Sequence, residues 1–147
     1  MKKLAAGLLL SLGASVAQAG GQAPQTAPRL FVLSDIGNEP DDQMSLVRLL
    51  LYANQIDIEG FGATTSVWQR NKVRPDIALK VIAAYGEVAA RLREHDPAYP
   101  DAAVLAGRVS SGVAGYGVAA VDAVHPSEAA LALLAAARRP DPRPLWV

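Results

Sequence analysis

Cysteine is absent from this chain of 147 residues, which excludes a disulfide framework and any metal site built on thiolates. Histidine is scarce, and the two histidines lie far apart in the sequence, which argues against a zinc centre. Neither sign of charge predominates, because 14 Lys and Arg residues balance 14 Asp and Glu residues. This balance argues against a nucleic-acid-binding protein, which usually carries a basic excess. With 51% hydrophobic residues, the chain can build one domain with a core of its own.

The first nineteen residues have the three parts of a signal peptide. Lys2 and Lys3 form a basic start, residues 4–16 are apolar, and Ala17-Gln18-Ala19 has the small-x-small pattern of a cleavage site. The apolar run is shorter than the ~20 residues that span a bilayer. The alternative is a buried amino-terminal helix. We predict cleavage after Ala19 and a secreted or periplasmic protein, whose mature chain has no membrane span.

Beyond the leader, the pattern is that of an α/β protein. Residues 20–28 are rich in Gly, Gln, Ala and Pro and are predicted to be a flexible lead-in to a domain at 29–147. The pattern predicts strands at 29–34, 56–64, 102–105 and 145–147, helices at 40–52, 75–92 and 127–137, and a glycine- and serine-rich loop at 107–117. Because strands joined through helices run parallel with right-handed crossovers, we predict a Rossmann-like parallel sheet flanked by helices.

Two of these helices have apolar stripes that should face the sheet. In the second helix the stripe passes through Ile77, Val81, Ala84 and Val88. In the first helix the apolar residues at helical spacing are Met44, Val47 and Leu51, and the stripe is widened by Leu46, Leu50 and Ala53.

Four carboxylates lie together between the first strand and the first helix. Asp35 directly follows the strand, and Glu39, Asp41 and Asp42 all lie within the seven residues after Asp35. Open α/β sheets bind ligands at the carboxyl ends of their strands, and a hard cation such as calcium or magnesium relieves the repulsion between crowded carboxylates. The alternative is that Asp41 and Asp42 only complement the dipole of a helix that begins at Pro40. Asp35 favours the cation site, because a helix start does not need it.

The same residues carry a family resemblance. Asp35-Ile36-Gly37 followed by Asp41-Asp42 resembles the Asp-x-Gly-x-Asp-Asp fingerprint of nucleoside hydrolases. The longer strings SDIGNEPDDQMSLVRLL, IDIEGFGATTSVWQRNKVRPD and RPDPRPLWV are closer still to a bacterial exported family. Its members are described as cellulose-binding, with a nucleoside-hydrolase-like amino-terminal domain. The resemblance covers nearly everything after the leader. It implies a nucleoside-hydrolase-like fold that is incomplete at the C-terminus, so we expect the chain to be the amino-terminal part of a longer protein and to be inactive alone.

The resemblance also implies roles for individual residues. Asp35 corresponds to a calcium ligand and general base, Asp42 to a second calcium ligand, and Asp41 to a catalytic residue that meets the sugar hydroxyls or the attacking water. Glu39 has no counterpart, because the gap between Asp35 and Asp41 is longer than in classical nucleoside hydrolases.

The loop after the second strand supplies further candidates for substrate binding. Nucleoside hydrolases place a sugar-binding asparagine in this loop, and the resemblance leaves Ser66 and Asn71 as candidates here. The alternative for both is ordinary loop polarity and helix capping. Trp68 is a candidate for stacking on a sugar ring, and its alternatives are core packing or a contact with another domain.

Together these features favour an exported, metal-dependent hydrolase of N- or O-glycosidic bonds in the whole protein. The expected ligand is a carbohydrate or a nucleoside-like small molecule. The alternative is a non-catalytic protein that binds carbohydrate such as cellulose.

Overall fold

The computed structural model describes residues 26–147. The predicted signal peptide at 1–19 and most of the predicted lead-in at 20–28 lie outside the described residues. Among the helices at 26–147, none has the length and apolar character needed to cross a membrane.

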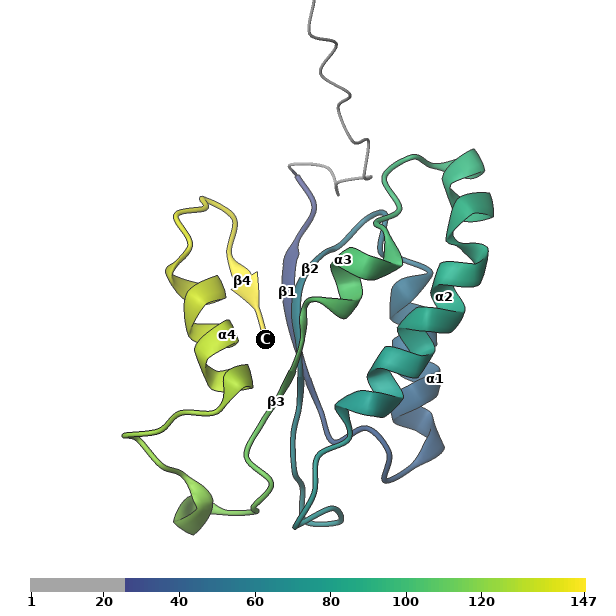
Figure 1. Cartoon of the computed structure of the whole chain (residues 1–147). Helices are drawn as coiled ribbons and strands as arrows, with labels where there is room; N and C mark the ends of the chain where they lie inside the picture. The colour runs from purple at the N-terminus through teal and green to yellow at the C-terminus, as the bar shows by residue number, and fades with distance from the viewer. Residues whose placement is uncertain (1–25) are drawn as a thin grey trace, which may run out of the picture.

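Four parallel strands form a sheet with the order β3-β2-β1-β4. The strands are β1 (Arg29–Ser34), β2 (Asp57–Ala63), β3 (Val109–Ser111) and β4 (Leu145–Trp146). The helices are α1 (Pro40–Leu50), α2 (Pro75–His95), α3 (Ala102–Ala106), the 3-10 turn η1 (Val118–Ala120) and α4 (Glu128–Arg138). Helices α1, α2 and α3 cover one face of the sheet and α4 covers the other (Figure 1). The predicted α/β architecture, a Rossmann-like parallel sheet flanked by helices, is confirmed.

One aromatic ring of β1 lies against the main chain of the neighbouring strand β2. The side chain of Phe31 is completely buried, and the pairing of β1 with β2 shifts register between Leu30 and Phe31. A Cβ atom built on Gly60 of β2 would overlap the ring of Phe31. Gly60 therefore allows the ring to lie directly across the neighbouring strand.

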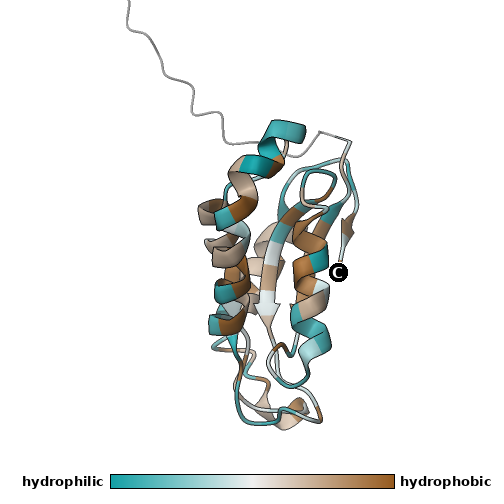
Figure 2. Ribbon diagram, turned by 90° about the vertical axis from the view of Figure 1, so that its right-hand side faces the viewer, coloured by the Kyte–Doolittle hydropathy of each residue, from teal (hydrophilic) through white to brown (hydrophobic). Residues whose placement is uncertain are grey.

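Helices α1 and α2 bury some of their apolar residues in the core beneath them. Figure 2 shows hydrophobic residues on the helices of both layers. The buried residues of these two helices and the turn after α1 are Leu46, Leu50, Ala53, Ala78, Ile82, Tyr85 and Ala89. The first predicted stripe was correct in part, because Leu46, Leu50 and Ala53 are buried as predicted. Met44, Val47 and Leu51 are 64%, 49% and 48% exposed, and the buried stripe of α2 lies one residue after the predicted one. Both helices have apolar residues on adjacent faces, so the periodicity alone does not select which face meets the sheet.

Two local predictions around residue 105 were also wrong. Residues 102–105, predicted as a strand, belong to the short helix α3, which buries Leu105 at 3% exposure. The predicted loop at 107–117 contains strand β3, which pairs with Phe61–Ala63 of β2. By contrast, the predicted start of α4 is confirmed, because the Ser127 hydroxyl accepts a hydrogen bond from the Ala130 N–H at 3.3 Å.

Candidate functional site

The loops that carry the predicted site residues meet at one edge of the sheet. They follow β1, β2 and β3 and lie together at the lower end of the molecule in Figure 1. Main-chain bonds join them, because the Thr64 N–H donates to the Ser34 carbonyl and the Gly112 N–H donates to the Ala63 carbonyl, each at 2.8 Å. The Thr65 hydroxyl also donates to the Gly115 carbonyl at 3.1 Å. This edge is where open α/β sheets place their ligands.

The acidic turn after β1 is held in shape by a hydroxyl and a buried side chain. Ser34 Oγ donates to Asp42 Oδ1 at 3.0 Å and accepts from the Ile36 N–H at 3.0 Å. The Ile36 side chain is completely buried. Gly37 has a φ of 99° and lies so close to Ile77 and Arg74 that a side chain would collide with them. These contacts bring the strand end and the first turn of α1 together, as the sequence predicted.

The start of α1 shows how each carboxylate is used. Pro40 is the first residue of the helix, Asp41 and Asp42 lie in its first turn, and the N-cap residue Glu39 makes no side-chain cap bond. Asp41 and Asp42 are therefore placed to complement the helix dipole. Asp35 lies outside the helix and is half-buried at the end of β1. A helix-dipole role accounts for two of the predicted site residues and leaves Asp35 unexplained.

The ligand atoms at this turn are of the kind that a hard cation prefers, but there are too few of them to complete its coordination. Asp35, Asp42 and the hydroxyl of Ser34 all offer oxygen, which calcium prefers, but calcium takes 6–8 oxygen ligands. Over the part of the chain that the structure describes, no three acidic, histidine or cysteine side chains are grouped so that they could hold a metal ion. A calcium ion bound to Asp35 and Asp42 would need its remaining ligands from water, substrate hydroxyls or other oxygen atoms.

The loop after β2 contains a tight turn formed by Ser66, Val67, Trp68 and Gln69. Ser66 Oγ accepts bonds from the N–H groups of Trp68 and Gln69, both at 3.1 Å, and the Ser66 N–H donates to the Gln69 carbonyl at 3.2 Å. The Ser66 hydroxyl thus serves the capping role that was the alternative to sugar binding. Asn71 is exposed two residues beyond this turn.

Trp68 projects into solvent from the same turn. Its side chain is 76% exposed, which excludes the alternative of packing in the core of this domain. A second exposed ring, Tyr116 on the loop after β3, is 48% exposed and lies 5.3 Å from the guanidinium of Arg70. This cation–π contact brings the loops after β2 and β3 together on the exposed surface.

The residues that sequence reasoning missed are Ser34 in the acidic turn, and Gln69, Arg70 and Tyr116 in the neighbouring loops. Gln69 is 2% exposed although it lies in a polar loop, and its Nε2 donates to the main-chain carbonyl of Asp35 at 3.1 Å. Its neighbours in sequence give no signal of this burial. The contact between Arg70 and Tyr116 joins segments too far apart in the chain for local patterns to reveal it.

With this geometry established, comparison with known proteins identifies the family. Residues 29–147 match the family described as "Cellulose-binding Sde182, nucleoside hydrolase-like domain". The chain belongs to this family. The chain is also similar to a solved structure, with 32% sequence identity and a TM-score of 0.78. That structure is of a nucleoside hydrolase-related hypothetical protein from Saccharophagus degradans that is associated with carbohydrate metabolism. The match covers 82% of this chain and 29% of that protein, so the chain spans less than a third of the relative's length. No curated protein matches the chain. The predicted family resemblance is confirmed.

Proposed function

We propose that the whole protein is an exported, metal-dependent hydrolase of N- or O-glycosidic bonds, with the acidic turn after β1 as its reacting centre. The observation that carries this proposal is the placement of Asp35. It lies half-buried at the carboxyl end of the central strand β1, next in sequence to Ser34, whose hydroxyl bonds to Asp42, and it has no part in starting α1. A carboxylate at that edge of a parallel sheet is suited to a ligand rather than to the fold.

The proposed roles follow from where the three aspartates lie. Asp35 is the general base for the attacking water and a metal ligand, and Asp42, oriented by Ser34, is the second ligand. Asp41 is exposed at the helix start and meets the hydroxyls of the sugar. A calcium ion bound to Asp35 and Asp42 would orient the water and lower its pKa. The carboxylates would stabilise the positive charge that develops on the sugar carbon as the bond breaks.

A second candidate function is carbohydrate binding without catalysis. The exposed ring of Trp68 favours it, because a sugar ring can stack on a flat aromatic surface, and Tyr116 adds a second exposed ring across the Arg70 contact. The description of the family as cellulose-binding supports the same ligand class.

The deciding experiment compares Asp35→Asn with wild type in the whole natural protein, with calcium and with a chelator. Calcium should raise the melting temperature of wild type, because a ligand that binds only the folded state stabilises it. Asp35→Asn should abolish this rise and the hydrolysis of nucleosides or aryl glycosides, while the fold remains. Asp41→Asn should reduce turnover more than calcium affinity.

Asp76→Asn is the matched control, because Asp76 occupies the first turn of α2 as Asp41 occupies that of α1. It should leave calcium binding and turnover unchanged. If the helix dipole is the whole role of the acidic turn, calcium has no effect, Asp35→Asn is silent and Asp41→Asn costs about 0.3–1 kcal/mol. Binding of soluble cello-oligosaccharides without turnover would favour the second candidate function.

A further inference from the structure

Gln69 is the most deeply buried polar residue at the carboxyl edge of the sheet. Its side chain is 2% exposed although the turn that contains it, Ser66 to Gln69, lies on the surface. The Ser66 hydroxyl accepts from two consecutive main-chain N–H groups of this turn, those of Trp68 and Gln69. Trp68 is exposed and Gln69 is buried, so one turn directs one side chain to solvent and the next to the interior.

The carboxamide of Gln69 reaches the turn that holds the proposed reacting centre. Its Nε2 donates to the carbonyl oxygen of Asp35 at 3.1 Å. The orientation of the amide is determined by this contact, because the reversed group would set an oxygen against the Asp35 oxygen, and both are acceptors. The bond therefore links the loop after β2 to the residue at the end of β1.

The other end of the carboxamide has no partner. Within residues 26–147, Oε1 of Gln69 is buried and accepts no hydrogen bond. A buried acceptor without a partner disfavours the folded state, and an apolar side chain of the same length would avoid this cost. At this position a carboxamide therefore contributes one thing that an apolar side chain cannot, which is the hydrogen bond to the Asp35 carbonyl.

We propose that Gln69 is a positioning residue, which fixes the main chain at Asp35 and thereby the direction in which the Asp35 carboxylate projects. It acts through Asp35 and does not itself touch the reacting atoms. The role in turnover rests on the proposed function, whereas the effect on the order of the acidic turn does not depend on it.

The structure supplies a matched control at the opposite edge of the sheet. Asn54, just before β2, is the other buried side chain in the described part of the chain whose oxygen has no partner. It is 9% exposed, and its Nδ2 donates to Asp96 Oδ2 at 2.7 Å, beyond the end of α2. Asn54 therefore shares the burial, the chemical group and the unpaired oxygen of Gln69 but lies away from Asp35.

The test measures hydrogen–deuterium exchange of the acidic turn, residues 34–43, in Gln69→Met and Asn54→Leu of the whole natural protein. Gln69→Met keeps the length of the side chain and removes the donor, so exchange in this segment should accelerate roughly tenfold, the order expected for one lost hydrogen bond. Asn54→Leu should leave exchange at 34–43 unchanged and accelerate it around 54 and 96. Gln69→Asn, one methylene too short to reach Asp35, should behave like Gln69→Met.

Turnover gives the second readout. In Gln69→Met, kcat should fall roughly tenfold with KM nearly unchanged, and in Asn54→Leu both should stay at the wild-type value even if the melting temperature falls equally. The inference is overturned if exchange at 34–43 is unchanged in both Gln69 variants, or if Asn54→Leu accelerates it as much. If wild type neither hydrolyses glycosides nor responds to calcium, the proposed function fails, and the exchange comparison still decides the role of Gln69.

Discussion

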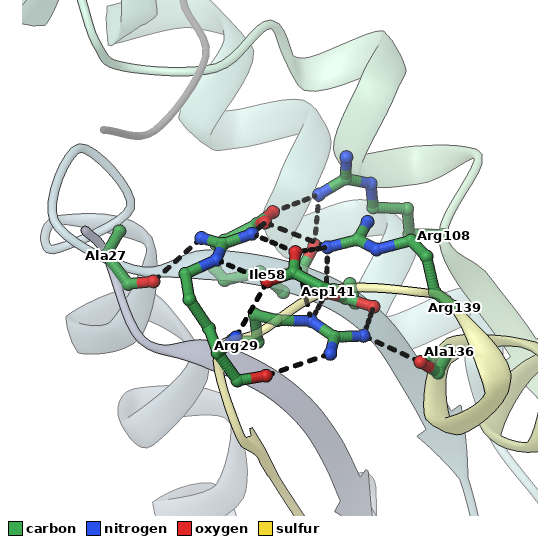
Figure 3. A network of polar contacts seen from close by, with 10 residues as sticks. Ala27, Arg29, Ile58, Arg108, Ala136, Arg139 and Asp141 are labelled. Carbon is green, nitrogen blue, oxygen red and sulfur yellow. Dashed lines mark hydrogen bonds and ion pairs between the residues drawn. The ribbon is translucent and has the colours of Figure 1, made fainter. Parts of the chain in front are cut away.

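Arg29 and Glu59 form an ion pair that is almost completely buried between the two central strands, with side chains 3% and 4% exposed. Nε and Nη2 of the Arg29 guanidinium donate to the two carboxylate oxygens of Glu59, and the bond from Nη2 to Oε2 measures 3.0 Å. Arg29 also donates to the main-chain carbonyls of Ala136 and Arg143, at 2.6 and 3.1 Å. Figure 3 shows the wider network. The pair thus ties β1 and β2 to the end of α4 and to the segment that leads into β4.

Removing the charge of Glu59 should be strongly destabilising. Glu59→Gln leaves the buried Arg29 guanidinium with Asp141 as its nearest remaining counter-charge, at 3.7 Å. Breaking a buried pair by removing one partner costs roughly 3–5 kcal/mol, and the low end applies because Asp141 remains. Urea denaturation measures the change. Asp101→Asn is the control, since Asp101 pairs with Arg93 at 2.7 Å near the surface and should change stability by about 0–1 kcal/mol. Equal losses in the two variants would contradict the prediction.

The same network should make the fold sensitive to acid. The guanidinium of Arg143 bonds to Asp141 at 2.7 Å and holds the pKa of that carboxyl well below its usual range, with further help from Arg139. A carboxyl whose folded pKa is depressed stabilises the fold above its unfolded pKa of about 3.9, and this contribution disappears as the pH falls through the folded value. Melting temperatures measured from pH 7 to pH 2 should therefore fall less steeply in Asp141→Asn than in wild type. Parallel curves would show that Asp141 does not contribute.

The position of the Phe31 ring against Gly60 predicts a sharp difference between two glycines. Gly60→Ala places a methyl group in the space of the Phe31 ring, and overpacking of this kind typically costs about 1–3 kcal/mol. Gly107→Ala is the control, because Gly107 has an ordinary helical conformation, with φ of −66°, and its added Cβ would meet ordinary contact distances. Differential scanning calorimetry should show a large loss for the first variant and little change for the second. Similar melting temperatures would mean that Phe31 moves aside at low cost.

The elements that sequence reasoning placed well are those with a local signal. Apolar runs and a proline at the helix start mark β1 and α1, and a serine cap marks α4. The errors arose where tertiary contacts decide. Residues 102–105 are short and apolar, and neither periodicity nor length separates a strand from a single helical turn in so short a segment. Strand β3 consists of Val109 and two serines, and its pairing with β2 depends on the neighbouring strand rather than on its own sequence.

The candidate site divides in the same way. The sequence alone places Asp35, Asp41 and Asp42 at one strand end, because chain order is enough to do so. Gln69 could not be found in this way, since its burial depends on a turn closed by Ser66 and on a contact across to another loop. The use of Ser34 to orient Asp42 was missed because a serine at a strand end has no distinctive pattern.

Export can be tested directly. Lys2, Lys3 and the Ala17-Gln18-Ala19 pattern predict removal of the first nineteen residues. Mass spectrometry of the protein from its native host should find a mature terminus at Gly20 in the periplasmic or secreted fraction. Ala19→Pro should block cleavage and leave a precursor in the membrane fraction, because signal peptidase requires a small residue at that position. A cytoplasmic protein that retains Met1 would contradict the prediction.

The last prediction concerns the exposed ring of Trp68. If it stacks on a sugar, Trp68→Ala should weaken binding of a soluble cello-oligosaccharide by about 1 kcal/mol or more, which is roughly fivefold in affinity. Trp68→Phe should retain part of the binding, because a flat ring remains. The control is Trp146→Ala, which removes another tryptophan, 62% exposed on β4 and paired beside Leu30 rather than at the carboxyl edge.

Two quantities, the affinity from calorimetric titration and the melting temperature, are compared across the three variants. Together they separate a sugar-binding role from a contact with another domain of the protein. Sugar stacking predicts that Trp68→Ala loses affinity while its melting temperature stays close to that of wild type, because an exposed ring contributes little to the core. A domain contact predicts the reverse, with affinity unchanged and the melting temperature lowered. A loss of affinity in Trp146→Ala equal to that in Trp68→Ala would mean that the carboxyl edge is not the place where carbohydrate binds.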